Sequence, residues 1–273
     1  MTQNSLMDFN ILLAQLGQVG RLLSDLGAAE GAAGNISVCL RGSLDVTALF
    51  PTMQIVELPV RVPELAGATV IVTGSGRRLR EISDSPKDNL ACIVIENSGE
   101  TGRMFTSESC PFKRVTSEFN SHLAIHHDQM KSSDVQLHTV LHAQPVHLTY
   151  LSHIPAYQEE RYFNTHLFRW QPETILSIPQ GIGVLPFIVN GSDDQMAATV
   201  ESMREHPLVV WARHGVVARA DDSLLHALDL IEYAEAAAHY EALNLSTGEK
   251  ADGLNPDEIR QICEKWGISQ EIY

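Results

Sequence analysis

The sequence has little positive charge. Its 19 lysines and arginines stand against 34 aspartates and glutamates, which gives a formal net charge of −15 at pH 7. Phosphate backbones are captured by clustered lysine and arginine side chains. The charge balance therefore predicts no nucleic-acid partner, although a small anionic ligand needs only a local pocket.

Clustered cysteines and long apolar runs are also missing. The four cysteines are scattered without CxxC spacing, which indicates neither a zinc ribbon nor a disulfide framework. No apolar run approaches the roughly 18 residues that span a bilayer, and residues 1–21 lack the pattern of an export signal. We therefore expect a cytoplasmic protein that does not insert into membranes.

The remaining composition is that of a folded chain. The sequence has 273 residues, of which 44% are hydrophobic and 19% are charged, as in soluble globular proteins. It contains no internal repeat, low-complexity tract or linker, so we expect one domain over residues 1–273. Apolar spacing predicts helices from residue 9 to near Gly27 and over residues 118–130, 193–205, 223–243 and 255–266. Short apolar runs predict strands over residues 36–40, 69–73, 92–95, 139–142, 174–178 and 208–212, and hence an α/β fold.

Two histidines follow or end predicted strands. On an extended strand, His142 and Gln144 point to the same face with Cα atoms roughly 6.6 Å apart, close enough for one metal ion. A histidine in place of Gln144 would be a strong metal signal, and His138 is about 13 Å too far along the strand to replace it. His214 follows the apolar run 208–212, where a packed scaffold can hold a ligand. Taken singly, each histidine is more often a surface or hydrogen-bonded core residue than a metal ligand.

Polar groups gather at two further turns and at Asn35, which opens a predicted strand. Thr116, Ser117 and Glu118 offer two hydroxyls and a carboxylate at a helix start, where an ordinary helix cap is the alternative. The segment Gly74-Ser75-Gly76 suits phosphate binding by backbone N–H groups, but a plain turn needs the same residues. We place Arg77, Arg78 and Arg80 outside the site, as a solvated face.

In this order along the chain, five segments resemble the class II aldolase/adducin family. They are Gly34-Asn35-Ile36-Ser37, Val72-Thr73-Gly74-Ser75-Gly76, Thr116-Ser117-Glu118, Val140-Leu141-His142 and Trp211-Ala212-Arg213-His214-Gly215. Within the family, the chain is similar to the branch that acts on L-rhamnulose 1-phosphate, through residues 72–76, 88–90 and 179–186. No single segment is decisive, but the ordered set is.

The resemblance implies a central mixed or mostly antiparallel sheet of nine strands flanked by helices, and a homotetramer. It also implies a metal-dependent aldolase of a phosphorylated deoxyketose, with L-rhamnulose 1-phosphate as the substrate. The implied phosphate-binding residues are Asn35, Ser75, Gly76, Thr116 and Ser117, and Glu118 is the implied acid/base. His142 and His214 are the implied ligands of a divalent metal, and Glu173 matches an acidic residue near it.

The sequence departs from the family pattern at two positions. Gln144 replaces the second histidine of a His-x-His pair, and Ala32 replaces an asparagine of the glycine-rich turn. Glu173 could complete a His₂Glu zinc site, or Gln144 could itself ligate and favour Mn²⁺ or Mg²⁺ over zinc. The chain could also be a metal-free, non-catalytic oligomeric binding protein, or an epimerase or dehydratase of the same family.

Overall fold

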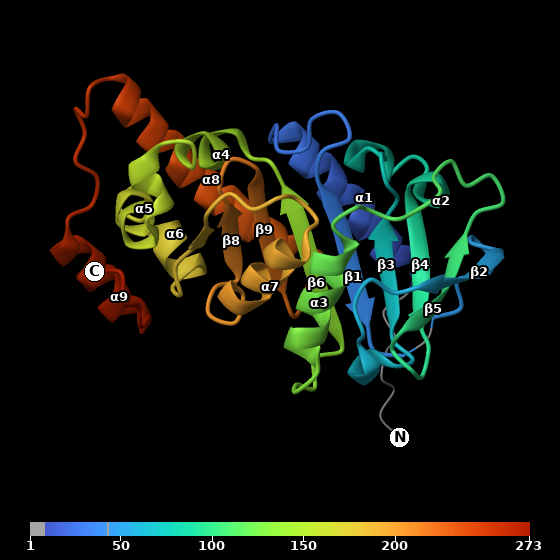
Figure 1. The fold of residues 1–273 in the computed structure, drawn as a ribbon. Helices are drawn as coiled ribbons and strands as arrows, with labels where there is room; N and C mark the ends of the chain where they lie inside the picture. The colour runs from blue at the N-terminus through green and yellow to red at the C-terminus, as the bar shows by residue number, and fades with distance from the viewer. Residues whose placement is uncertain (1–8, 43) are drawn as a thin grey trace.

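One sheet runs through the whole of the computed structural model, which describes residues 9–42 and 44–273 (Figure 1). Within this part of the chain the sheet has nine strands in the order β2-β5-β4-β3-β1-β6-β9-β8-β7. Neighbouring strands are antiparallel, except for the parallel pair β7 and β8. The mixed, mostly antiparallel sheet expected from the resemblance is confirmed.

The strands differ in burial along the sheet. Their bounds are β1 Asn35–Leu40, β2 Thr52–Glu57, β3 Thr69–Thr73, β4 Leu90–Ile95, β5 Thr101–Thr106, β6 Leu137–Ala143, β7 Gly183–Leu185, β8 Leu208–Trp211 and β9 Gly215–Ala220. Every residue of the central strands β1 and β6 is buried, whereas the edge strand β2 is mostly exposed. The centre of the sheet is thus a rigid platform for side chains that project from its ends.

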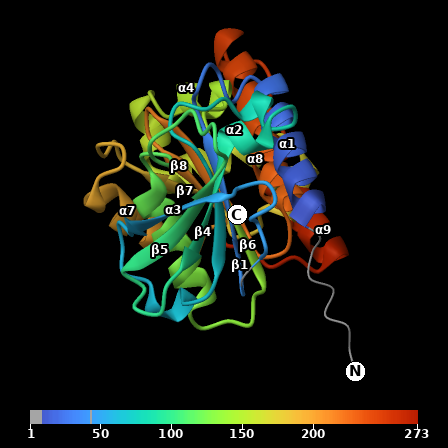
Figure 2. The same ribbon diagram turned by 90° about the vertical axis from the view of Figure 1, so that its right-hand side faces the viewer.

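Helices cover both faces of the sheet. They are α1 Phe9–Asp25, α2 Pro86–Asn89, α3 Phe119–Met130, α4 Val146–Leu151, α5 Glu160–Leu167, α6 Pro172–Ser177, α7 Asp193–Ser202, α8 Leu224–Ser246 and α9 Pro256–Trp266. Figure 2 shows α1, α8 and α9 on one side of the sheet and α3 and α7 on the other. No helix in residues 9–42 and 44–273 is long and apolar enough to cross a bilayer.

Because side chains along each strand point alternately to the two faces of the sheet, each face has its own hydrophobic core. Ile36 and Val38 of β1 and Leu141 of β6 join the core beneath α1 and α8. The residues between them face α3, because successive side chains of a strand point to opposite faces. Asn35 and Ser37 of β1 therefore share the α3 side with His142 of β6, and Asn35 pairs directly with His142 in the strand register.

One predicted element is wrong. Residues 174–178 do not form a strand, because residues 172–177 form α6. Pro172 stands at the first helical turn, where its missing N–H costs nothing, and Thr174 and Ile175 are buried. Strands β2, β5, β7 and β9 and helices α2, α4 and α5 were not predicted, because their apolar patterns are short or irregular.

Candidate active site

A cavity of about 180 Å³ lies at the end of the sheet where β1 and β6 meet the start of α3. Its walls combine backbone from glycine-rich turns with hydroxyl, carboxylate, amide and imidazole side chains. The residues that line it are Ala32, Ala33, Gly34, Asn35, Gly74, Ser75, Gly76, Arg77, Thr116, Ser117, Glu118, His142, Gln144 and His214. Residues from widely separated parts of the sequence thus meet in one concave site.

The entry to β1 is built for close approach to β6. Gly34 has φ +77°, which L side chains rarely adopt. A Cβ added to Gly34 would lie 2.9 Å from the carbonyl oxygen of His142. Glycine therefore lets the chain turn into the strand against β6, which places Asn35 beside His142.

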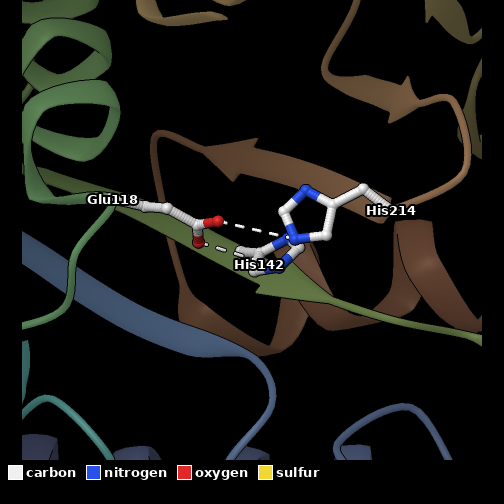
Figure 3. A group of neighbouring side chains, drawn as sticks. All are labelled: Glu118, His142 and His214. Atoms are coloured by element: carbon white, nitrogen blue, oxygen red, sulfur yellow. Dashed lines mark ion pairs between the residues drawn. The ribbon is translucent and has the colours of Figure 1, made fainter. Parts of the chain in front are cut away.

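Glu118 stands at the first turn of α3, where its carboxylate faces two imidazoles (Figure 3). Its Oε2 lies 3.7 Å from Nε2 of His142, and its Oε1 lies 3.5 Å from Nε2 of His214. The Asn35 amide donates to Oε2 at 2.7 Å. One ligand atom from each of Glu118, His142 and His214 lies within 4.8 Å of the others.

His214 comes from the tight turn between β8 and β9. Arg213 has φ +66°, an unusual value for a residue other than glycine, and its N–H donates to Ser152 Oγ at 2.8 Å. The His214 ring stacks on Trp211 with 5.3 Å between centroids, and the Trp211 indole donates to Thr199 Oγ1 at 2.9 Å. The turn and the stacked indole together hold the His214 imidazole at the cavity.

A cation site requires lone pairs on the histidines, and His142 has one directed at Glu118. Its Nδ1 donates to the carbonyl oxygen of Val216 at 2.9 Å. With the proton on Nδ1, the lone pair lies on Nε2, the nitrogen that faces Glu118. The backbone of β9 therefore fixes the tautomer that a metal ligand needs.

Electrostatics favour an ionised carboxylate and a neutral His214. Burial raises the pKa of Glu118, but the His142 imidazole, the Asn35 amide and His214 together outweigh burial and leave the pKa below its usual value. Burial, followed by the charge of His142, lowers the pKa of His214 to about 4. Near neutral pH the site thus presents an ionised Glu118 carboxylate facing a neutral His214 imidazole.

This donor set fits a divalent cation. Carboxylate and imidazole side chains are common ligands of zinc and other transition metals. The Nε2 atoms of His142 and His214 face carboxylate oxygens across 3.5–3.7 Å, and an ion among them would replace the repulsion between lone pairs by attraction. Asn190 donates its amide N–H to Nε2 of His214 at 3.0 Å, which places a donor at the position that an ion would take.

Two loops that line the cavity are pinned side by side. Gly74 forms a bridge with Val115, the Ser75 N–H donates to Arg114 O at 2.9 Å, and the Thr116 N–H donates to Thr73 O at 3.0 Å. These contacts bring Ser75, Gly76, Thr116 and Ser117 to one side of the cavity. Hydroxyls and turn backbone gathered in this way suit a phosphate group.

The structure brings Gln144 into the cavity but places Glu173 elsewhere. Gln144 lines the wall next to His142. Glu173 is an exposed residue in the first turn of α6, where the helix dipole favours a carboxylate. Within the described residues Glu173 neither lines this cavity nor joins the cluster of possible ligands. The carboxylate that lies with the two histidines is Glu118.

The sequence analysis missed one residue that lines the cavity and one that contacts a histidine of the site. Arg77 was placed outside the site, yet it lines the cavity, and its Nε donates to Asn89 Oδ1 at 3.1 Å. Its position directly after Gly76 was the available signal. Asn190 reaches His214 from a loop 24 residues earlier, and nothing in its local sequence distinguishes it from an ordinary turn residue.

The comparisons with known proteins point to one family. Residues 14–242 match the family model of the class II aldolase and adducin N-terminal domain. The chain is 30% identical over 247 residues to rhamnulose-1-phosphate aldolase of Mannheimia succiniciproducens, a match that covers 89% of each protein. It is 27% identical over 252 residues to the enzyme of the same name from Enterococcus faecalis, which covers 90% of this chain and 88% of that one.

A solved structure of a related protein has a similar fold. A crystal structure of a sugar-phosphate aldolase from Thermotoga maritima superposes with a TM-score of 0.76 at 25% identity. The match covers 89% of this chain and 98% of that one. Because the family model spans most of the sequence and the fold agrees, this chain belongs to the class II aldolase/adducin family.

Proposed function

We propose that this chain is a metal-dependent aldolase that cleaves a phosphorylated deoxyketose, L-rhamnulose 1-phosphate, to dihydroxyacetone phosphate and L-lactaldehyde. The observation that carries this proposal is the convergence of Glu118, His142 and His214 on one wall of the cavity. The printed names of the two relatives support the choice of substrate. We also propose that the chain acts as a homotetramer, the assembly that the family resemblance implies.

His142, His214 and Glu118 would hold the metal, with the Gln144 carbonyl as a neutral donor at the edge of the site. Zinc suits the imidazoles, whereas an amide oxygen moves the preference toward harder ions such as Mn²⁺ or Mg²⁺. When bound, the ion would supply Lewis-acid polarisation of the substrate ketone. Glu173 is not needed for this set within one chain.

The cavity wall formed by the two pinned loops would bind the phosphate. Ser75, Gly76, Thr116 and Ser117 line the cavity from these loops and offer hydroxyls and turn backbone. Arg77 adds a cation that Asn89 and Glu81 hold in place. A phosphate on this wall would leave the rest of a short sugar to reach Glu118.

The proposed role of Asn35 differs from that of a simple phosphate ligand. Its amide N–H is used by Glu118, and its Oδ1 is buried without a partner in the described structure. A carbonyl oxygen repels phosphate but accepts a hydrogen bond from a sugar hydroxyl. We therefore assign Asn35 to orienting Glu118 and to binding a substrate hydroxyl.

Glu118 is the proposed acid/base. In cleavage the bond between the third and fourth carbons breaks, and the hydroxyl proton on the fourth carbon must leave as the aldehyde forms. The electron pair of the broken bond stays on the third carbon, which must gain a proton. One ionised carboxylate beside both carbons can accept the first proton and deliver it to the second position.

The proposal is tested by product analysis with metal-loaded protein. The substrates are L-rhamnulose 1-phosphate, L-fuculose 1-phosphate and a pentulose 1-phosphate, each followed for release of dihydroxyacetone phosphate. The expected result is fastest release from L-rhamnulose 1-phosphate. Conversion without carbon–carbon cleavage would point to an epimerase or dehydratase, and inactivity on every substrate would contradict the proposed function.

A further inference from the structure

Four buried side chains beside the active site form a continuous row of hydrogen bonds. Ser37 Oγ lies 2.7 Å from Nδ1 of His122 and 2.7 Å from Nε2 of His126. Nδ1 of His126 lies 2.6 Å from Nδ1 of His138. All four residues have zero exposure. Burying polar groups is costly unless they pair, so the row is a feature that packing alone does not require.

The row follows one face of α3 and the sheet beneath it. His122 and His126 are one and two helical turns beyond Glu118, so all three share a helix face. Ser37 is two residues beyond Asn35 on β1, and His138 is four residues before His142 on β6. The same layers that build the active site therefore continue directly into the row.

One end of the row is one helical turn from Glu118, whose backbone carbonyl oxygen accepts the backbone N–H of His122 at 3.1 Å. Nε2 of His122 is buried and has no hydrogen-bond partner in the described structure. Burial and His126 lower the pKa of His122 to about 3, against the opposing effect of the Glu118 charge. The imidazole is therefore neutral, lies within the field of the carboxylate, and has one nitrogen free to take or give a proton.

The other end lies at the surface. Nε2 of His138 lies 3.6 Å from Oδ1 of Asp221, whose side chain is 49% exposed. That separation is too long for a direct hydrogen bond. A small side-chain movement or one bridging water molecule would connect the two atoms. The four residue steps along β6 from His138 to His142 correspond to about 13 Å, the span from the active site to this surface point.

The hydrogen bonds in the row can be oriented in two ways. A neutral imidazole has one donor and one acceptor nitrogen, and a serine hydroxyl donates once. If His138 carries its proton on Nε2, the three internal bonds fix the protons on Nδ1 of His126, Oγ of Ser37 and Nδ1 of His122. In the reverse arrangement every proton moves to the other side of its bond, and Nε2 of His122 carries one.

Passage between the two arrangements moves one proton. Nε2 of His122 accepts a proton that Glu118 gives up through one bridging water molecule, and Nδ1 of His122 passes its own to Ser37. Ser37 passes its hydroxyl proton to Nε2 of His126, whose Nδ1 proton goes to Nδ1 of His138. Nε2 of His138 then releases its proton to Asp221 or water. One proton enters and one leaves, no bond between heavy atoms changes, and each imidazole begins and ends neutral.

We propose that His122, Ser37, His126 and His138 form a proton relay between Glu118 and solvent at Asp221. Glu118 is only 5% exposed and lines the cavity that the substrate would occupy. A filled cavity separates the carboxylate from water at the mouth, and the relay gives it a second route. This role rests on the proposed function, because it concerns the proton that Glu118 exchanges with a substrate carbon.

The first test compares proton exchange with cleavage. Metal-loaded protein is incubated with dihydroxyacetone phosphate alone in D₂O, and deuterium entering the substrate carbon is followed by NMR. Cleavage of L-rhamnulose 1-phosphate is measured separately, since it can return its proton inside the site. For Ser37→Ala we expect the ratio of exchange rate to cleavage rate to fall at least tenfold. An unchanged ratio overturns the proposal.

Ser121→Ala is the matched control. Ser121 is a fully buried serine in α3, the helix that carries His122 and His126. Its hydroxyl has no partner in the described structure. The substitution removes the same atom without cutting the row, so the ratio is expected to stay at its wild-type value. A general loosening of the fold lowers both rates together, whereas loss of the relay lowers exchange alone.

A second test does not depend on any substrate. Labelling of histidine with ¹⁵N allows the imidazole N–H groups of His122, His126 and His138 to be followed by NMR during exchange with water. A relay predicts faster exchange for them than for the buried amides of β6, and Ser37→Ala should remove His122 from the fast group. Slow exchange at all three histidines overturns the relay, whereas inactivity on every sugar phosphate overturns the proposed function instead.

Discussion

The amide of Asn35 donates to the carboxylate of Glu118 at 2.7 Å, although the two residues are 83 positions apart. Asn35 opens β1 and Glu118 opens α3, so one contact ties the sheet to the helix that covers it. The contact also helps to keep Glu118 ionised, since an N–H donor lowers the pKa of a carboxylate. It sets the position of the proposed acid/base.

Replacement of Glu118 by glutamine should abolish most of the activity. The amide keeps the size of the side chain but cannot accept the substrate proton, and general acid/base catalysis is worth roughly 10²–10⁴-fold. We expect kcat for release of dihydroxyacetone phosphate to fall by that factor. Glu108→Gln, at an exposed position, is the control. Retention of more than half of the wild-type kcat would remove Glu118 from the proposed role.

Gln144→His should strengthen zinc binding. Position 144 lines the cavity beside His142, and imidazole is a better zinc donor than an amide oxygen. We expect the Kd for zinc, measured by competition with a chromophoric chelator, to fall at least tenfold, which corresponds to about 1.4 kcal/mol. Gln144→Ala separates the two effects, because it removes the amide without adding a ligand. Equal zinc affinity in all three proteins would show that position 144 does not reach the ion.

Gly215→Ala should damage the site by steric contact. The added Cβ would lie 2.3 Å from the carbonyl oxygen of Ala143 and 3.2 Å from Cε1 of His142. Relief of the clash must move β9 or β6, at a cost of about 1–3 kcal/mol in the free energy of unfolding. We expect weaker metal binding together with this loss of stability in urea denaturation.

Gly42→Ala provides the comparison for that experiment. Gly42 has φ +90° with nothing within 4 Å of an added Cβ, and it lies beyond the far end of β1. Its substitution should cost stability through backbone strain while metal affinity stays unchanged. The same loss of metal affinity in both variants would refute the steric explanation for Gly215.

The buried histidines should make the metal-free protein sensitive to acid. Burial lowers the pKa of His122 and of His138 to about 3, whereas unfolded histidine titrates near 6.5. Below about pH 6.5 the unfolded chain therefore binds protons that the folded chain does not. The free energy of unfolding should fall from about pH 6.5 toward pH 3, by up to about 1.4 kcal/mol per pH unit for each histidine.

Urea denaturation at several pH values, with a chelator present, measures this slope. His138→Gln should reduce it by about one histidine, whereas the exposed His153→Gln should leave it unchanged. The slope is the relevant quantity, because either substitution can shift stability by a constant amount. A wild-type stability that stays flat between pH 7 and pH 4 is incompatible with three neutral buried histidines.

Much of the fold could be predicted where the local pattern was strong. The periodic apolar stripes of α1 and α8 and the β-branched run of β3 gave their elements to within a few residues. The run at residues 174–178 was misread, because its four apolar or β-branched residues fit a strand as well as a short buried helix. Sheet order and register depend on contacts between distant segments, which local patterns do not contain.

The site was predictable to the extent that its residues lie in recognisable segments. Glu118, His142 and His214 were predicted, and the structure places them together. Arg77 and Asn190 were not, because each acts through a contact that only the folded chain creates. The row from Ser37 to His138 was missed for the same reason, since two strands and a helix supply it.

The most direct measurement of the central claim is a metal titration of the chelator-treated protein. Zn²⁺ and, separately, Mn²⁺ are added in steps while bound metal and release of dihydroxyacetone phosphate from L-rhamnulose 1-phosphate are both recorded. We predict that activity rises in proportion to bound metal and saturates at about one ion per chain, and that His142→Ala and His214→Ala abolish both. Full activity after exhaustive chelation, or saturation with metal without any cleavage, would contradict the account.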